Sequence, residues 1–115
     1  MLVPDVVVAV QNYLRALQQH GIATRFAVVF GSQVTGKTDT WSDIDLLVVS
    51  PSFDALPDRQ VVDLLWRLSA RVDNRIEPLP CGVRQWEEGG DSAIVEIARR
   101  SGERVTLPDE PHAEG

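Results

Sequence analysis

Two aspartates stand one residue apart at the head of an apolar run, in the order Asp43-Ile44-Asp45 followed by Leu46 to Val49. On a strand, residues i and i+2 leave the same face, so both carboxylates point to one side while Ile44 points into a core. Adjacent carboxylates repel each other unless a cation neutralises them. Such a pair of oxygen ligands suits Mg²⁺, which binds one or two protein carboxylates together with water and substrate phosphates.

A Gly-Ser pair lies ten residues before these aspartates, directly after the apolar run from Phe26 to Phe30. The backbone N–H groups of a turn at Gly31 and Ser32 could bind the phosphates of a nucleotide. Ser32 also fits as the cap of a short helical turn at 33–37, and the two roles are compatible. Lys37 is either a further phosphate contact or a solvated lysine of a polar loop.

A third carboxylate is expected from a neighbouring strand. Phosphoryl-transfer sites with two metal ions stabilise both the entering and the leaving oxygen, and three carboxylates are the usual minimum to bind such a pair. Glu77 is the best placed candidate. Asp73 is the alternative, although it stands at the expected end of a helix.

The hydrophobic pattern predicts the elements that position these residues. Apolar residues at helical spacing indicate helices at 4–20, 57–73 and 93–100, with a short helical turn at 84–88. Continuous apolar runs indicate strands at 25–30 and 43–50, with further strands at 75–80 and 104–107. This alternation predicts an α/β protein with a layered sheet, organised as one domain at 1–107 followed by an acidic, disordered tail at 108–115.

Particular side chains refine this prediction. Pro78 and Pro80 cannot donate to a ladder, so the third strand should lie at an edge of the sheet or end early. Trp66, on the flank of the apolar stripe of its helix, should be a packing residue, and Cys81 should be buried filler. The buried face of the last helix is expected to consist of four residues: Ile94, Val95, Ile97 and Ala98.

Composition excludes several classes of protein. A chain of 115 residues with 43% hydrophobic residues is a single globular domain. The net charge of −6 argues against a stand-alone nucleic-acid binder. No apolar run approaches the roughly 20 residues of a membrane span, and the first residues lack the basic region of a signal peptide. A single cysteine favours a cytoplasmic location.

The spacing Phe30-Gly31-Ser32, then Gly36-Lys37, then Trp41-Ser42-Asp43-Ile44-Asp45 resembles the polymerase beta-like nucleotidyltransferase superfamily, in particular its minimal nucleotidyltransferase (MNT) branch. The resemblance spans most of the chain. It implies a single-layer mixed β-sheet flanked by helices, and transfer of a nucleoside monophosphate, such as AMP from ATP or another NTP.

The resemblance also implies roles for individual residues. Gly31, Ser32 and Lys37 would contact the nucleotide, while Asp43, Asp45 and Glu77 would bind two Mg²⁺ ions and carry catalysis. One departure is that Glu77, followed by proline, stands where the superfamily commonly has Asp.

Relatives of this size are often encoded beside a HEPN protein, a helical partner that is commonly an RNase toxin. Some are similar to antitoxins that adenylylate a tyrosine of the toxin. The chain ends where larger relatives add an acceptor-binding domain, so the acceptor is expected on a partner or another subunit. Two alternatives are a non-catalytic antitoxin that masks its partner, and transfer to a small molecule.

Overall fold

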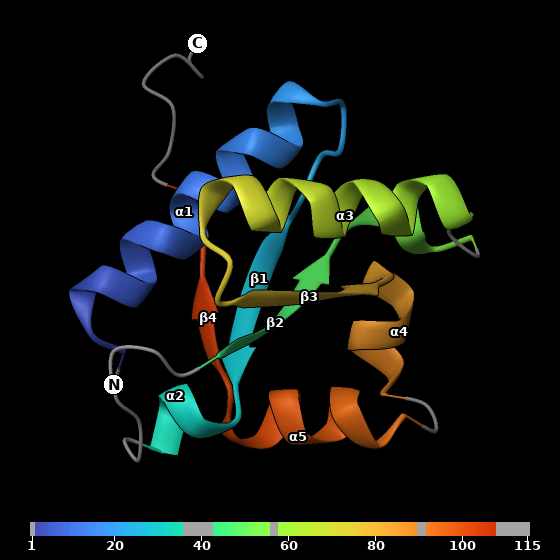
Figure 1. Cartoon of the computed structure of the whole chain (residues 1–115). Helices are drawn as coiled ribbons and strands as arrows, with labels where there is room; N and C mark the ends of the chain where they lie inside the picture. The colour runs from blue at the N-terminus through green and yellow to red at the C-terminus, as the bar shows by residue number, and fades with distance from the viewer. Residues whose placement is uncertain (1, 36–42, 56–57, 90–91, 108–115) are drawn as a thin grey trace, which may run out of the picture.

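The sheet and its helices are seen in a computed structural model, which describes residues 2–35, 43–55, 58–89 and 92–107. Figure 1 shows the elements in chain order. They are α1 (Pro4–Gln19), β1 (Phe26–Phe30), α2 (Ser32–Thr35), β2 (Ile44–Val49), the 3-10 turn η1 (Pro51–Phe53), α3 (Arg59–Val72), β3 (Ile76–Cys81), α4 (Val83–Glu88), α5 (Ala93–Ser101) and β4 (Glu103–Val105).

The strands form one mixed sheet in the order β3-β2-β1-β4. β2 and β3 are parallel, whereas β1 pairs antiparallel with both β2 and β4. α1 and α3 cover one face of this sheet, and α4 and α5 cover the other (Figure 1). The expected single-layer mixed sheet flanked by helices is confirmed.

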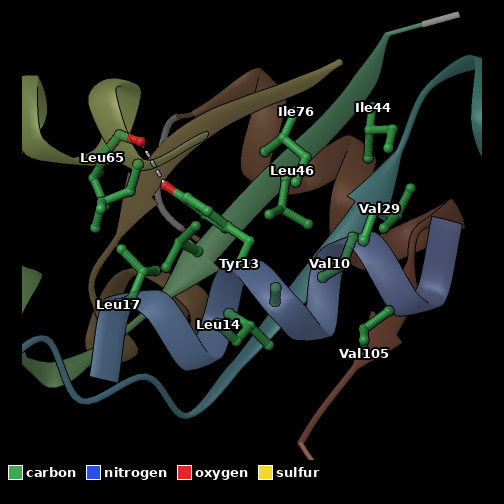
Figure 2. Close-up of a cluster of buried hydrophobic side chains, with 14 of the residues drawn as sticks. Val10, Tyr13, Leu14, Leu17, Val29, Ile44, Leu46, Leu65, Ile76 and Val105 are labelled. Atoms are coloured by element: carbon green, nitrogen blue, oxygen red, sulfur yellow. Dashed lines mark hydrogen bonds between the residues drawn. The ribbon is translucent and has the colours of Figure 1, made fainter. Parts of the chain in front are cut away.

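The larger core lies between the sheet and the pair α1 and α3. Figure 2 shows Val10, Tyr13, Leu14 and Leu17 of α1 directed at the sheet, as their helical spacing predicted. The Tyr13 hydroxyl donates to the Leu65 carbonyl of α3 over 2.9 Å. Because this bond is buried, it joins the two helices inside the core instead of at their surface.

β3 is an edge strand of the sheet, as its prolines predicted. The Arg75 carbonyl accepts from the Ile44 N–H, and the Cys81 carbonyl accepts from the Ser50 N–H. The backbone N–H and C=O groups of the odd-numbered residues of β3 therefore point toward β2. The backbone nitrogens of Pro78 and Pro80 therefore point away from β2, toward the open edge of the sheet. They cost the ladder no donor, and they leave the outer edge with fewer N–H groups to recruit another strand.

Two predictions about side-chain burial are wrong. In α5 only Val95 and Ala98 are buried, whereas Ile94 and Ile97 are 41% and 50% exposed. The reason is that this short helix rests on β1 along one narrow i, i+3 stripe. Trp66 is 45% exposed because it points away from the Leu65 and Leu68 face of α3, which meets the core.

The remaining expectations concern Cys81, membrane spans, the tail, the domain organisation and the location of the protein. Cys81 is fully buried. Among the residues that the structure describes, no helix has the length and apolar character needed to cross a membrane. The acidic tail predicted at 108–115 lies outside the described residues, and the single-domain organisation and the cytoplasmic location stay predictions.

Candidate active site

The turn after β1 brings the chain directly against the second aspartate. Gly31 has a φ of +78°, the left-handed region that glycine adopts without steric cost. A Cβ atom at this position would lie 2.5 Å from Oδ2 of Asp45. Only glycine therefore permits both the turn and the close approach of the carboxylate, and the Gly-to-Asp spacing in the sequence reflects this contact.

Three carboxylates gather beside this turn. Asp45 of β2 stands opposite Phe30 of β1 and opposite Glu77 of β3 in the sheet register. The Glu77 side chain is hydrogen-bonded to those of both Asp43 and Asp45. Glu77 therefore lies within hydrogen-bonding reach of both aspartates.

Burial and mutual repulsion govern the charge of this cluster. The pKa of Asp45 is raised above its ordinary value, first by burial and then by the negative charge of Asp43, although its hydrogen bond with Glu77 acts in the opposite direction. The pKa of Glu77 is also raised, first by its hydrogen bond with Asp43, then by burial and by the charges of both aspartates. A bound cation would favour the charged forms of Asp45 and Glu77 and so act against these effects.

The donor set fits a hard divalent cation, because all three side chains supply carboxylate oxygens on one side of the sheet. The carboxylates contact one another, however. In the described part of the chain, no three His, Cys, Asp or Glu side chains surround a common point as ligands of one ion. Cation binding would thus require the carboxylates to separate and to turn toward a common point.

The alternative third acid, Asp73, lies in a different environment. Its carboxylate forms an ion pair with Arg75, with 2.6 Å between Oδ2 and Nη2. The hydrogen bond and charge of Arg75 lower the pKa of Asp73, against an opposing effect of burial. The geometry therefore places Glu77, and not Asp73, beside the paired aspartates.

Gln33 is a site residue that the sequence did not reveal. It lies in α2 with 7% of its surface exposed, and its Nε2 donates to the Asp43 carbonyl over 3.2 Å. This bond ties the Gly-Ser turn to the residue that precedes β2. In the sequence, its position directly after the Gly-Ser pair is the signal that could have indicated it.

The described structure thus brings Gly31, Asp43, Asp45 and Glu77 together, as predicted. Lys37 and the Ser32 side chain lie outside what the structure describes, although α2 does begin at Ser32. The catalytic, nucleotide-binding and metal-binding roles assigned to all of these residues stay predictions.

Comparison with known proteins decides the family. A sequence model of the nucleotidyltransferase domain matches residues 10–97, which include Gly31 and all three carboxylates of the cluster. The chain belongs to the nucleotidyltransferase domain family. Its mixed sheet and flanking helices are those of the polymerase beta-like nucleotidyltransferase fold.

A solved structure shares the fold of this nucleotidyltransferase domain. One chain of a structure described as "Crystal structure of the toxin-antitoxin with AMP-PNP" matches with a TM-score of 0.56 at 17% sequence identity. The match covers 90% of this chain and 77% of that chain. A comparison with curated proteins found no matching relative.

Proposed function

We propose that this chain transfers a nucleoside monophosphate, AMP from ATP, to a hydroxyl group of a partner protein. The observation that carries the proposal is the close approach of Gly31 to Asp45, which clusters with the carboxylates of Asp43 and Glu77. Membership of the nucleotidyltransferase domain family supports the class of reaction. The nucleotide, the acceptor and the use of Mg²⁺ belong to the proposal.

Each residue of the cluster has a role in the proposed reaction. The backbone of the Gly31–Ser32 turn holds the triphosphate, and Gly31 leaves room for the carboxylate of Asp45 beside the turn. Asp43, Asp45 and Glu77 would hold Mg²⁺, which supplies charge stabilisation for the triphosphate when bound. The acceptor oxygen forms a bond to the α-phosphorus as the bond to pyrophosphate breaks, and Asp45 or Glu77 takes the hydroxyl proton.

A protein acceptor is supported by two observations. A protein of the same fold was crystallised as a toxin–antitoxin with AMP-PNP, which pairs an adenine nucleotide analogue with a protein complex. In this chain Asp43 is exposed, so the edge of the cluster is open to a macromolecule. The resemblance of the motif to the MNT branch further supports the proposal that the partner is a HEPN-type toxin and that modification neutralises it.

The experiment incubates the purified chain with ATP, Mg²⁺ and the product of the adjacent gene, and measures the intact mass of that product. We expect a gain of one AMP moiety with the wild-type chain. We expect none with the double variant Asp43→Asn/Asp45→Asn. Asp63→Asn, which changes an exposed carboxylate of α3, is the matched control and should behave like the wild type. An unmodified partner in every reaction contradicts the proposal.

A second candidate is a module that masks its partner without chemistry. The exposed side chain of Trp66 favours it, because aromatic side chains are enriched where proteins meet. Co-expression in cells separates the two functions. If the Asp43→Asn/Asp45→Asn variant still relieves toxicity, masking suffices; if relief is lost while the complex persists, catalysis is required.

A further inference from the structure

Arg75 connects three elements just before the third carboxylate of the cluster. Its guanidinium binds Asp73 through two contacts, Nη2 to Oδ2 at 2.6 Å and Nε to Oδ1 at 2.9 Å. Nη2 also lies 3.0 Å from Oδ2 of Asp5 in the first turn of α1. The Arg75 side chain is 14% exposed and that of Asp73 is 19% exposed, so this pair is largely withdrawn from water.

The main chain of Arg75 is held in the same place. Its N–H donates to Oδ1 of Asp73 over 3.0 Å, and the Ile76 N–H donates to the Asp73 carbonyl over 3.0 Å. The Asp73 side chain therefore binds both the backbone and the guanidinium of Arg75. Together these bonds fix the path of the chain from the end of α3 into β3.

This fixed segment meets β2 between the two aspartates. The Arg75 carbonyl accepts from the Ile44 N–H over 2.8 Å, and Ile44 lies between Asp43 and Asp45. Two residues further along β3, Glu77 stands opposite Asp45. A slip of one residue between the strands would turn Glu77 to the opposite face of the sheet, away from both aspartates.

We propose that Arg75, held by Asp73, is a positioning residue that sets β3 against β2 so that Glu77 lies beside Asp43 and Asp45. The inference rests on the proposed function, since it concerns the same cluster. Arginine suits the role because its planar fork binds a carboxylate in two places, whereas lysine offers a single point charge. A substitution at Arg75 therefore alters the cluster without removing any of its carboxylates.

The test compares the Mn²⁺ affinity of variants by the electron paramagnetic resonance signal of free Mn²⁺, with no nucleotide or partner present. For Arg75→Lys we expect the dissociation constant to rise about tenfold or more, as for other residues that orient metal ligands. The substitution Asp73→Asn is nearly isosteric, and we expect it to raise the dissociation constant for Mn²⁺ as well. Circular dichroism melting of each variant establishes that it is folded during the titration.

Arg100→Lys and Glu96→Gln are the matched controls. Arg100 and Glu96 form an i, i+4 ion pair on α5 at 2.9 Å, but their side chains are 77% and 49% exposed. These controls should bind Mn²⁺ with wild-type affinity, because exposed pairs contribute little. A purely structural role for Arg75 would lower the melting temperature of Arg75→Lys and leave Mn²⁺ affinity unchanged, and that result overturns the inference.

The same titration distinguishes this inference from the proposed function. If Asp43→Asn/Asp45→Asn abolishes Mn²⁺ binding while folded Arg75→Lys and Asp73→Asn bind normally, only the positioning role fails. If the double aspartate variant binds Mn²⁺ as the wild type does, the proposed metal-dependent site fails as well.

Discussion

Gly31 and Gly21 share a backbone conformation but not their surroundings. Their φ angles are +78° and +85°. A Cβ at Gly31 would collide with the Asp45 carboxylate, whereas one at Gly21 would meet no atom within 4 Å. Both alanine variants should lose about 1–2 kcal/mol of stability from the left-handed conformation.

Only Gly31→Ala should impair nucleotidyl transfer, on the order of 100-fold, because it displaces Asp45 from the cluster. Initial rates of transfer, measured on both variants at a temperature where both are folded, test this prediction. An equal loss of transfer rate in Gly21→Ala and Gly31→Ala would show that backbone strain alone explains the loss.

Cys81 illustrates a buried group that takes no part in the proposed site. Burial, and secondarily the negative charge of Asp54, raises the pKa of its thiol to about 11. At pH 8 the fraction of Cys81 present as thiolate is therefore about 100-fold lower than that of an ordinary thiol. Labelling by a chromogenic disulfide at pH 8 should therefore be slow in the native protein and rapid in urea. Rapid labelling of the native state would contradict this burial.

The residues of the site differ in how far the sequence predicted them. Asp43, Asp45 and Gly31 were predictable, because strand alternation and the Gly-Ser turn act over short distances. The sequence favoured Glu77 but left Asp73 open as an alternative, because the pairing of Asp73 with Arg75 is visible only in the folded chain. Gln33 was missed because its partner is a backbone carbonyl ten residues away.

At the scale of elements, Tyr13 is the hydrogen-bonded link between α1 and α3. Burial raises the pKa of its hydroxyl above the ordinary value, so it stays a neutral donor. Tyr13→Phe removes the 2.9 Å bond to the Leu65 carbonyl and should cost about 0.5–1.5 kcal/mol. Equilibrium unfolding in urea measures this difference. A variant as stable as the wild type would show that the bond makes no net contribution.

The Asp73 side chain links the end of α3 to the start of β3, and its contribution to stability should depend on pH. Because Arg75 lowers the folded-state pKa of Asp73, the ionised carboxylate stabilises the fold above its unfolded pKa of about 4. That stability is lost as the pH falls through the lower folded pKa.

Asp73→Asn should therefore be destabilised by about 1–3 kcal/mol near pH 7. The difference in free energy of unfolding between the variant and the wild type should become smaller below about pH 4. Urea unfolding of both proteins across this range provides the measurement. A difference that does not change with pH would contradict an ionic contribution from Asp73.

The elements themselves followed closely from hydrophobic periodicity and from their caps. Asp58 caps α3 by accepting from the Val61 N–H, and Ser92 caps α5 by accepting from the Val95 N–H. Burial was harder to predict, as Ile94 and Ile97 show. Which stripe of an apolar helix faces the sheet depends on the strand beneath it, and a short helix offers several apolar directions.

At the scale of the whole molecule, the sheet order assembles the site. Placing β2 between β1 and β3 brings the Gly31 turn to one side of Asp45 and Glu77 to the other. Alternating elements predicted an α/β sheet, but local patterns do not encode strand order or direction. The expectation of a mixed sheet therefore came from the fold family that the motif resembles and not from periodicity.

The central claim is that this cluster carries out nucleotidyl transfer. The most direct test incubates the chain, Mg²⁺ and the product of the adjacent gene with ATP labelled at the α-phosphate or, in parallel, at the γ-phosphate. The account predicts that label from the α-phosphate becomes bound to protein, that label from the γ-phosphate does not, and that Asp43→Asn/Asp45→Asn abolishes the transfer. Transfer of the γ-label, or undiminished α-label transfer by the double variant, would contradict it.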